Sequence, residues 1–308
     1  MKTLVIGGSG FLGSHVADEL TERGHEVTIF DNIESKYIID KQKMVVGNIA
    51  KFEDLNSVIS ENQIVYHFAG IAGIQDASDN PIKTVKNNIL GTTYVLESCK
   101  INKIRRFVFA SSIYVYSELG SFYRTSKQSC ELLIENYNKI YDLNFTVLRY
   151  GALYGRRAND FNFIGSAIKQ ALLNKKIVRE GNGEEIRDYI HVKDAAVASV
   201  DILEEKYNDS YIMISGNQIV KVKDILNMIN EMLNGAIKIE YVNSENEDHY
   251  EITPYTFRPR LAKKILLKEY HELGQGILDC IYDTYKKIGK TSGIKDLNIV
   301  LPESVDFR

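Results

Sequence analysis

Short apolar runs alternate with amphipathic stretches through the first half of the chain. Runs without polar interruption predict strands buried on both faces of a sheet. The strands expected on this basis are Thr3–Ile6, Glu26–Phe30, Lys43–Val46, Ile64–Phe68, Arg106–Ala110 and Phe145–Arg149. Apolar positions three and four residues apart predict helices between them, as over Asn87–Lys100 and Thr125–Tyr141. This alternation predicts an α/β fold, a doubly wound parallel sheet with helices on both faces.

The pattern loosens in the second half. Gly181-Asn182-Gly183 marks a turn, and residues 243–248 are polar and acidic. We expect residues 1–155 to form one domain and residues 156–308 to form mainly a smaller lobe that binds substrate. Some of this lobe should return to the sheet, because Tyr211–Ile214 has the character of a strand.

Spaced glycines follow the first expected strand, and an amphipathic helix follows them. The segment reads Thr-Leu-Val-Ile-Gly-Gly-Ser-Gly-Phe-Leu-Gly over residues 3–13. Gly7 and Gly10 permit a tight turn that a phosphate can approach, and Gly13 lets the helix pack close to the strand. The helix N-terminus then offers N–H groups and a partial positive charge to a pyrophosphate. The glycines match two dinucleotide-binding patterns, G-x-G-x-x-G starting at Gly8 and G-x-x-G-x-x-G starting at Gly7. The motif therefore predicts a dinucleotide site, but it does not specify the reaction.

An acidic residue ends the second expected strand. Asp31 stands near the place where a dinucleotide-binding fold carries the acid that binds the adenosine ribose. A carboxylate there repels a 2′-phosphate, so it favours NAD over NADP. The alternative is an ordinary strand–turn–helix unit in which Asp31 is merely solvated.

Composition narrows the classes of function. Of 308 residues, 26% are charged and the net charge is −3, so no basic surface for nucleic acid is expected. No apolar run is long enough to span a membrane, and the first strand leaves no room for a signal peptide. The 3 cysteines are widely spaced, which suits the reducing cytoplasm. Cysteines and histidines form no metal-binding pattern, so no metal is expected.

A serine, a tyrosine and a lysine occur where such a sheet binds its ligands, beyond the carboxyl ends of the strands. Ser112 follows the strand expected at 106–110, and Tyr123 and Lys127 lie four residues apart on the next helix, on one face. A phenol acts as a base near neutral pH only if its pKa falls by about 3 units, which takes about 4 kcal/mol. A neighbouring ammonium in a cleft of low dielectric supplies energy of that order. Ser112 would hydrogen-bond the substrate oxygen.

The Tyr-x-x-x-Lys spacing alone is uninformative in this chain. It also occurs at Tyr37–Lys41, Tyr189–Lys193 and Tyr282–Lys286. Only Tyr123 follows a serine at a strand end, so position distinguishes it. Two alternatives remain, a silent NAD-sensing protein and a dehydrogenase of another type with His191 as its base.

Taken in order, these residues resemble the extended short-chain dehydrogenase/reductase family, the NAD-dependent epimerase/dehydratase group that acts on nucleotide sugars. Nearly the whole chain takes part. Further segments carry the resemblance, namely His67-Phe68-Ala69-Gly70, Asn88-Ile89-Leu90-Gly91-Thr92, Leu148-Arg149-Tyr150 and Arg187-Asp188-Tyr189-Ile190-His191-Val192-Lys193-Asp194. The resemblance implies a Rossmann-like fold, bound NAD, a nucleotide-diphosphate sugar as substrate and the glycine register that starts at Gly7. It also implies a homodimer in which helices 87–100 and 125–141 pair across a two-fold axis.

The resemblance also assigns roles to residues. Tyr123 is the base, Lys127 is its partner and a ribose contact, and Ser112 donates a hydroxyl to the substrate. Arg187 and Arg258 are expected to bind the substrate, Arg187 at its diphosphate, which suits a forked guanidinium. Contacts to NAD are expected from Gly7, Gly10, Phe11, Leu12, Asp31, Asn32, Asn48, Ile49, Phe68, Ala69, Gly70, Asn88, Ser111, Tyr123, Lys127 and Tyr150.

Four departures from the family pattern bear on the reaction. Asn48 stands where the family usually has Asp, and Gly151-Ala152 replaces a side chain followed by Asn, a contact to the nucleotide phosphates. Residues 113–122, between Ser112 and Tyr123, form a much shorter connection than usual, which opens the cleft or admits a larger substrate. Ile113-Tyr114 replaces the Asp-Glu pair of dehydratases, so 4,6-dehydration lacks its acid and base.

The reaction expected from these features is oxidation of a sugar hydroxyl, at C4, by hydride transfer to NAD. If the resulting ketone is reduced on its other face, the enzyme is an epimerase. If the ketone is released, the enzyme is a net 4-dehydrogenase, or a 4-ketoreductase in the reverse direction. These outcomes stay open at the level of the sequence.

Overall fold

The computed structural model describes residues 1–160, 162–243, 263–266 and 269–292. Its main sheet has eight parallel strands in the order β13-β10-β6-β5-β4-β1-β2-β3. Their bounds are β1 Lys2–Ile6, β2 Glu26–Asp31, β3 Gln42–Val46, β4 Ile64–His67, β5 Arg106–Ser112, β6 Phe145–Tyr150, β10 Ser210–Ile214 and β13 Lys263–Lys264. The order reverses between β1 and β4, so the doubly wound fold predicted from the sequence is confirmed.

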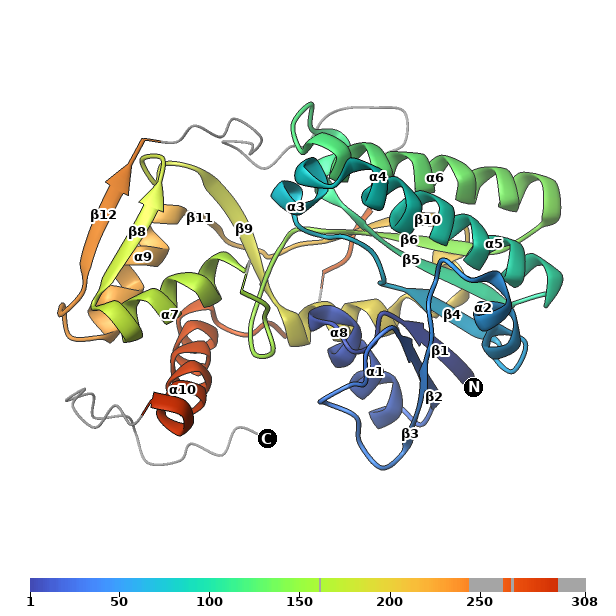
Figure 1. Ribbon diagram of the computed structural model, residues 1–308, viewed down its shortest axis with the longest axis horizontal. Helices are drawn as coiled ribbons and strands as arrows, with labels where there is room; N and C mark the ends of the chain where they lie inside the picture. The colour runs from blue at the N-terminus through green and yellow to red at the C-terminus, as the bar shows by residue number, and fades with distance from the viewer. Residues whose placement is uncertain (161, 244–262, 267–268, 293–308) are drawn as a thin grey trace.

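Helices cover both faces of this sheet (Figure 1). Helices α1 (Phe11–Glu22) and α8 (Val192–Asp201) pack on one face, where alternate strand residues such as Val5 and Tyr66 form a core with them. Helices α2 (Phe52–Ile59), α5 (Gly91–Ile101) and α6 (Ser121–Tyr141) pack on the other face. Two cores therefore flank one sheet, as the uninterrupted apolar strands require.

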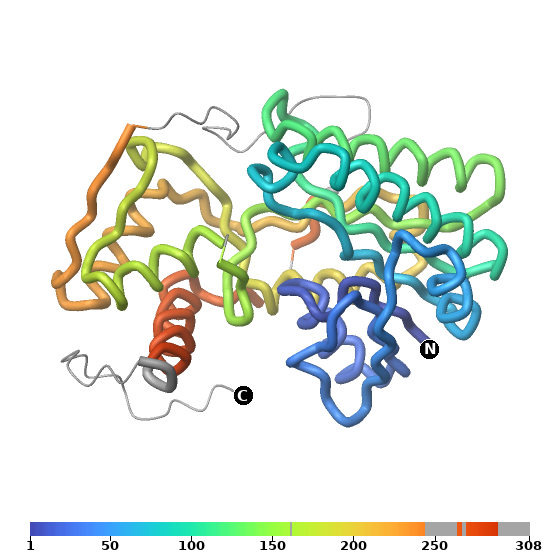
Figure 2. The backbone as a smooth tube through the Cα atoms, viewed as in Figure 1, coloured from blue at the N-terminus to red at the C-terminus, as the bar shows by residue number. Residues whose placement is uncertain are grey.

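A second lobe gathers the remaining elements, at the left of Figure 1. It contains a three-stranded sheet of β7 (Ala152–Tyr154), β9 (Ile186–His191) and β11 (Ile219–Lys221), and a pair of β8 (Lys176–Glu180) with β12 (Lys238–Val242). Helices α7 (Phe163–Asn174), α9 (Val222–Met232) and α10 (Leu273–Ser292) complete a third core. Figure 2 shows the chain leaving the main sheet after β6 and returning to it through α8 and β10.

The helix expected over Asn87–Lys100 is two elements in the structure. Residues Val85–Leu90 form a π-helical segment, η1, which continues into α5. Two short helices precede it, α3 (Ile74–Asp79) and α4 (Pro81–Thr84). The helical prediction for these residues is confirmed, and the structure adds that a wider π turn precedes the α-helical repeat. None of the helices in the described ranges is long and apolar enough to cross a membrane.

Candidate active site

The glycine-rich turn between β1 and α1 is packed so tightly that a side chain at Gly7 or Gly13 would force backbone atoms apart. Gly7 has a φ of +84°, and a Cβ there would lie 2.5 Å from the backbone nitrogen of Ala69. A Cβ at Gly13 would lie 2.2 Å from the carbonyl oxygen of Gly7. Helix α1 begins at Phe11, and its N-cap, Gly10, supplies no side chain to the first N–H groups. These N–H groups could therefore hold a diphosphate.

Asp31, at the end of β2, lies at the rim of this turn. Its carboxylate accepts hydrogen bonds from the backbone N–H groups of Ser9 at 3.0 Å and Asn32 at 2.8 Å. The bond to Ser9 ties the carboxylate to the glycine turn itself. A ribose seated beside the turn would therefore meet an oriented acid, which is the arrangement that NAD binding needs.

Two of the expected NAD contacts, Asn48 and Ile49, lie in the loop after β3 (Gln42–Val46). The Asn48 side chain is exposed, and its Oδ1 accepts the backbone N–H of Ala50 at 2.9 Å. Ile49 packs toward α5, where a Cβ on Gly91 would lie 2.9 Å from its Cδ1. The amide of Asn48 thus shapes the loop locally.

Asn88, in the π-helical segment η1, organises the loop that contains Phe68, Ala69 and Gly70. Its Oδ1 accepts the backbone N–H of Ile71 at 2.7 Å, and its Nδ2 donates to the Ile71 carbonyl at 3.0 Å. The same Nδ2 donates to Ser126 Oγ on α6 at 3.0 Å. The amide expected to touch NAD is therefore engaged with protein groups, and it joins the loop after β4 to α6.

Ser112, Tyr123 and Lys127 come together at the carboxyl end of β5. Ser112 is the last residue of that strand, and a hydrogen bond joins its side chain to that of Tyr123. Burial raises the pKa of Tyr123, and the hydrogen bond from Ser112 opposes this shift. The Lys127 Nζ lies 5.8 Å from the centre of the Tyr123 ring and donates to the Ala110 carbonyl at 2.7 Å. The site thus holds a phenol, a hydroxyl and an ammonium in mutual reach.

Two opposing effects act on the pKa of Lys127. Burial lowers its pKa, because an ammonium loses its hydration there, whereas electrostatic interactions with Cys130 and Glu131 raise it. Lys127 in turn helps to lower the pKa of His67 on β4, whose burial already brings it to about 3. The imidazole of His67 is consequently neutral, and it adds no positive charge beside Lys127.

The short connection between Ser112 and Tyr123 is compact. Residues Ile113–Tyr116 form a 3₁₀ turn, η2, and the Tyr114 ring packs edge-on against Tyr123 with their centres 6.2 Å apart. Gly120, with a φ of +100°, leaves room for this ring, since a Cβ there would lie 2.7 Å from the Tyr114 Cδ1. Sequence reasoning did not identify Tyr114 as a residue of the site, because the contact depends on how the turn folds.

Two other expected cofactor residues direct their hydroxyls into the protein. Tyr150, at the end of β6, shares a 2.6 Å hydrogen bond with Ser199 of α8. Ser111 donates to Glu131 Oε1 at 2.6 Å. Any contact of these residues with a cofactor would therefore come from their backbone atoms.

On the side of the second lobe, Arg187 is buried in β9. Its Nη1 donates to the carbonyl of Ile186 at 2.9 Å. The other arginine expected to bind substrate, Arg258, lies outside the described residues. His191, the alternative base, stacks on His271 with ring centres 4.3 Å apart, and burial lowers its pKa to about 3.

Among the described residues, His191, Asp194 and His271 form a group with ligand atoms within 4.8 Å of one another, as a metal site would need. Asp194 accepts the backbone N–H of His271 at 2.8 Å and also pairs with the ring of His271. Both oxygens of Asp194 are therefore occupied by His271. The group joins the start of α8 to the segment before α10.

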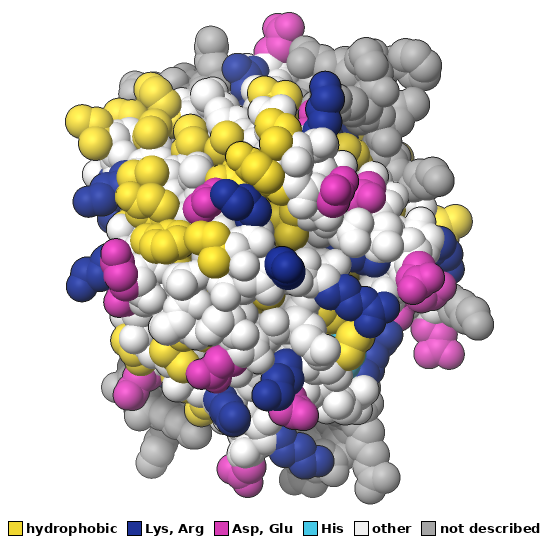
Figure 3. Space-filling model, turned by 90° about the vertical axis from the view of Figure 1, so that its right-hand side faces the viewer, with side chains coloured by type: hydrophobic (Ala, Val, Ile, Leu, Met, Phe, Trp, Pro, Cys, Tyr) yellow, Lys and Arg dark blue, Asp and Glu magenta, His cyan; other side chains and the backbone are white. Residues whose placement is uncertain are grey.

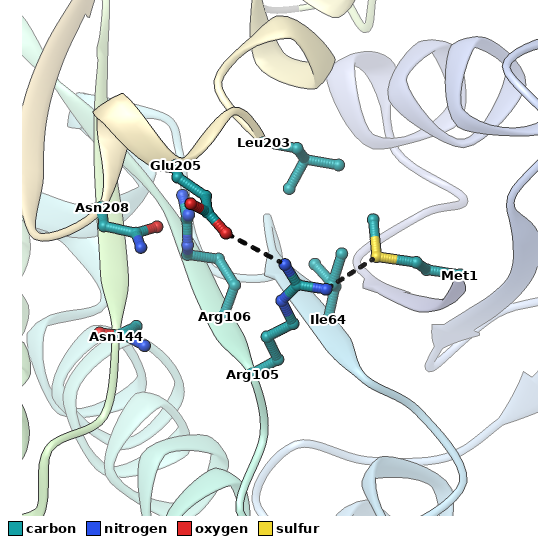
Figure 4. A pocket seen from close by; sticks show the side chains of 8 residues that line it. All are labelled: Met1, Ile64, Arg105, Arg106, Asn144, Leu203, Glu205 and Asn208. Atoms are coloured by element: carbon teal, nitrogen blue, oxygen red, sulfur yellow. Dashed lines mark hydrogen bonds and ion pairs between the residues drawn. The ribbon is translucent and has the colours of Figure 1, made fainter.

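A cavity of about 170 Å³ lies at the amino ends of the central strands (Figure 4). Ile64 and Arg106 in its wall are the first residues of β4 and β5, and Arg105 pairs with Glu205 at 3.7 Å across it. Doubly wound folds bind ligands at the carboxyl ends of their strands. This cavity therefore belongs to the other end of the sheet from Ser112, Tyr123 and Lys127.

Comparison with known proteins places the chain among nucleotide-sugar enzymes. A family model described as "NAD dependent epimerase/dehydratase family" matches residues 3–214. A UDP-N-acetyl-alpha-D-glucosaminuronate decarboxylase of Bacillus cytotoxicus is 28% identical over 270 residues, covering 79% of this chain and 84% of that protein. A putative UDP-glucose 4-epimerase of Methanocaldococcus jannaschii is 30% identical over 247 residues, covering 73% and 80%. A UDP-glucuronic acid 4-epimerase of Bacillus cereus, solved with UDP-glucuronic acid and NAD, superposes with a TM-score of 0.81 and 25% identity over 93% of this chain and 100% of that one.

Proposed function

The chain belongs to the NAD-dependent epimerase/dehydratase family of nucleotide-sugar enzymes, and we propose that it oxidises the C4 hydroxyl of a nucleotide-diphosphate sugar with Tyr123 as the base. The observation that carries the proposal is the meeting of Ser112, Tyr123 and Lys127 at the carboxyl end of β5. The enzyme uses NAD, which the whole family shares.

The residues of the glycine turn fit this cofactor. We propose that Gly7, Gly10, Phe11 and Leu12 hold the diphosphate through backbone N–H groups, and that Asp31 binds the adenosine ribose. Asn32, Ile49 and the loop after β4 would line the rest of the site. NAD supplies the acceptor for the hydride that leaves the sugar carbon.

Proton transfer is the task of this chain's own side chains. Tyr123 accepts the proton of the sugar hydroxyl, and Ser112 holds the same oxygen in place through a hydrogen bond. The hydrogen bond from Ser112 opposes the effect of burial on the pKa of Tyr123, and the Lys127 ammonium, 5.8 Å from the centre of the ring, would further favour the phenolate form. The edge-on ring of Tyr114 restricts the movement of the phenol.

We propose that the second half of the chain binds the sugar and its nucleotide, while residues 1–155 carry most contacts to NAD. Arg187, on β9, is the described residue with the charge and fork geometry for a diphosphate. Arg258 is proposed as a second ligand. The 4-epimerases among the relatives support this class of substrate.

Epimerase and net dehydrogenase or ketoreductase activity share this chemistry and differ in the fate of the ketone. We infer support for release from the short connection over residues 113–122, which leaves few residues to close over a bound sugar. Ile113 is buried, and it occupies the place of a dehydratase acid, so we propose no 4,6-dehydration.

The test is incubation with UDP-, GDP-, CDP- and dTDP-sugars while NADH absorbance and the sugar products are followed. Interconversion without net NADH identifies an epimerase, and NADH in step with product identifies a dehydrogenase. Tyr123→Phe should lower kcat by about 10²–10⁴-fold. Tyr282→Phe, at a matching Tyr-x-x-x-Lys pair on α10, should leave it unchanged. No turnover with any sugar, or unchanged turnover in Tyr123→Phe, contradicts the proposal.

We also propose a homodimer that forms through α5 and α6. Figure 3 shows hydrophobic side chains gathered on the upper part of the face where Figure 1 places these helices. Exposed apolar side chains of α4, η1, α5 and α6 include Ile82, Val85, Leu90, Ile101, Leu132, Ile140 and Tyr141. A patch of this kind marks an interface.

The three cysteines are free and buried, which supports a cytoplasmic location.

A further inference from the structure

We propose that the buried pair Glu131–Arg149 positions Ser112, Tyr123 and Lys127 relative to one another, an inference that rests on the function proposed above. Glu131 lies on α6 and Arg149 on β6, and their residues are 7% and 3% exposed. Arg149 donates through Nε to Glu131 Oε1 at 3.0 Å and through Nη2 to Oε2 at 2.6 Å. Such a two-point bond fixes both distance and orientation.

The pair holds the chain on both sides of Ser112. Ser111, its neighbour in β5, donates to Glu131 Oε1 at 2.6 Å. Tyr116, at the end of the 3₁₀ turn that follows Ser112, accepts a hydrogen bond from Arg149 Nη1 at 2.6 Å. The segment that presents the serine hydroxyl is therefore tied to one carboxylate–guanidinium unit at each end.

The same unit holds the helix that carries the base. Glu131 lies one turn after Lys127 and two turns after Tyr123 on α6, so the three side chains share one face. Through Arg149 and Ser111, this face is joined to β6 and β5. A shift of α6 along the sheet would break these bonds, and misplacement of catalytic groups by about 1 Å costs about 10²-fold in rate.

Two aromatic rings hold the guanidinium plane. The Arg149 Cζ lies 4.7 Å from the centre of the Tyr116 ring and 4.5 Å from that of Tyr211, which comes from β10. Tyr211 in turn donates to Glu135, one turn beyond Glu131 on α6. The pair is thus oriented as well as buried. A buried ion pair is seldom more stable than apolar residues of the same volume, so its value here is geometric.

The groups around Lys127 show that the pair also affects the protonation of this lysine. Tyr123, Cys130 and Glu131 face Lys127 from α6, and His67 faces it from β4. From β5, the Phe109 ring and the Ala110 carbonyl contact its ammonium. Glu131 is the carboxylate in this group, and it opposes the loss of the Lys127 proton on burial. Removing it should therefore affect both the geometry and the protonation of the site.

The test replaces both members of the pair, because a single change such as Glu131→Gln leaves Arg149 buried without its partner and endangers folding. The double variant Glu131→Leu/Arg149→Met keeps the volume apolar. We expect it to bind NAD within about threefold of the unchanged enzyme, with KM changed by less than about threefold and kcat lowered by about 10–100-fold. The acid limb of its pH–rate profile should move up by about one unit.

Two further variants bracket this result. Tyr116→Phe removes the bond on one side of Ser112 and keeps the ring, so kcat should fall by about 3–10-fold without loss of folding. Tyr137→Phe is the matched control, because it removes a phenol hydroxyl on α6 that donates to Glu97 at 3.0 Å and not to the pair, and it should leave kcat unchanged. If the double variant fails to fold, Tyr116→Phe against Tyr137→Phe decides. Equal kcat in Tyr116→Phe and Tyr137→Phe, or a folded double variant with full kcat, overturns the proposal.

A readout without substrate separates this proposal from the proposed function. The ultraviolet titration of Tyr123 is obtained as the difference between each NAD-saturated protein and the same protein carrying Tyr123→Phe. In the double variant it should move up by about one unit, and in Tyr137→Phe it should not move. If the unchanged enzyme turns over no nucleotide sugar but the titration moves, the proposed function fails and the positioning role stands. If sugars turn over but the titration and kcat are unmoved, the positioning role fails.

Discussion

Substitution of Gly13 tests the cofactor half of the site most directly. In Gly13→Ala the new Cβ would lie 2.2 Å from the carbonyl oxygen of Gly7. An ordinary contact between these atoms needs about 3.4 Å, so the turn or the start of α1 must move by about 1 Å. Both groups belong to the backbone, so no side-chain rotation can relieve the contact. Such overpacking costs about 1–3 kcal/mol.

The same displacement would move the N–H groups at the start of α1 away from the diphosphate. If the free-energy cost of overpacking reduces NAD binding in full, the NAD Kd should rise by about 5–100-fold, since about 1.4 kcal/mol corresponds to a tenfold change. NAD titration by calorimetry measures it, and a thermal scan without NAD records any loss of stability.

The matched control is Gly165→Ala in α7, where the nearest atom would lie 3.7 Å from the new Cβ. Alanine suits a helix better than glycine by about 1 kcal/mol, so this variant should be as stable as the parent or more so, with the same Kd. If Gly13→Ala bound NAD within twofold of the parent and melted at the same temperature, the steric reasoning would be refuted.

Three further changes address the cofactor choice, acid stability and assembly. Asp31→Ala should weaken NAD binding by about tenfold and reduce the preference for NAD over NADP, because the charge that repels a 2′-phosphate is gone. Fluorescence titration with NADH and NADPH measures the ratio of the two affinities. An unchanged ratio would contradict the prediction. Burial lowers the pKa of His67 from 6.5 to about 3, so the unfolded chain binds a proton there that the folded chain does not. Stability is therefore retained above pH 6.5 and lost as pH falls toward 3, by about 1.4 kcal/mol per pH unit, and chemical denaturation of His67→Gln between pH 7 and pH 5 should show a shallower loss than the parent. Leu132→Glu, on the exposed face of α6, should convert the dimer to a monomer in light scattering without loss of helical signal, whereas a parent that is already monomeric would count against the interface.

Much of the fold could be predicted because several strands of the main sheet contain uninterrupted apolar runs. The segment around Val108 is an example, since both of its faces are covered and no polar residue breaks it. The short strands β7 and β13 could not be found this way, because two or three residues carry no measurable period. The π-helical segment over Val85–Leu90 was also hidden, although the paired asparagines within it are poor helix formers.

The residues of the site that belong to sequence motifs could be predicted. Ser112, Tyr123 and Lys127 were identified from their order along the chain, and the structure brings them together. The pair Glu131–Arg149 was not found, because its members are distant in sequence and meet only through packing. The signal was present, since Arg149 is a charged residue inside a strand whose other positions predict complete burial.

The return of the chain to the main sheet through α8 and β10 constrains the order in which the protein can fold during synthesis. The Tyr66 hydroxyl donates to the Ser199 carbonyl at 2.8 Å, and buried Arg106 donates to the Ile202 carbonyl at 3.2 Å. Until the ribosome has released residues 192–214, these groups lack their partners and one face of β1 and β4 lacks the cover that α8 gives. The core of the main sheet can therefore close only after the segment between β7 and β9 has been made.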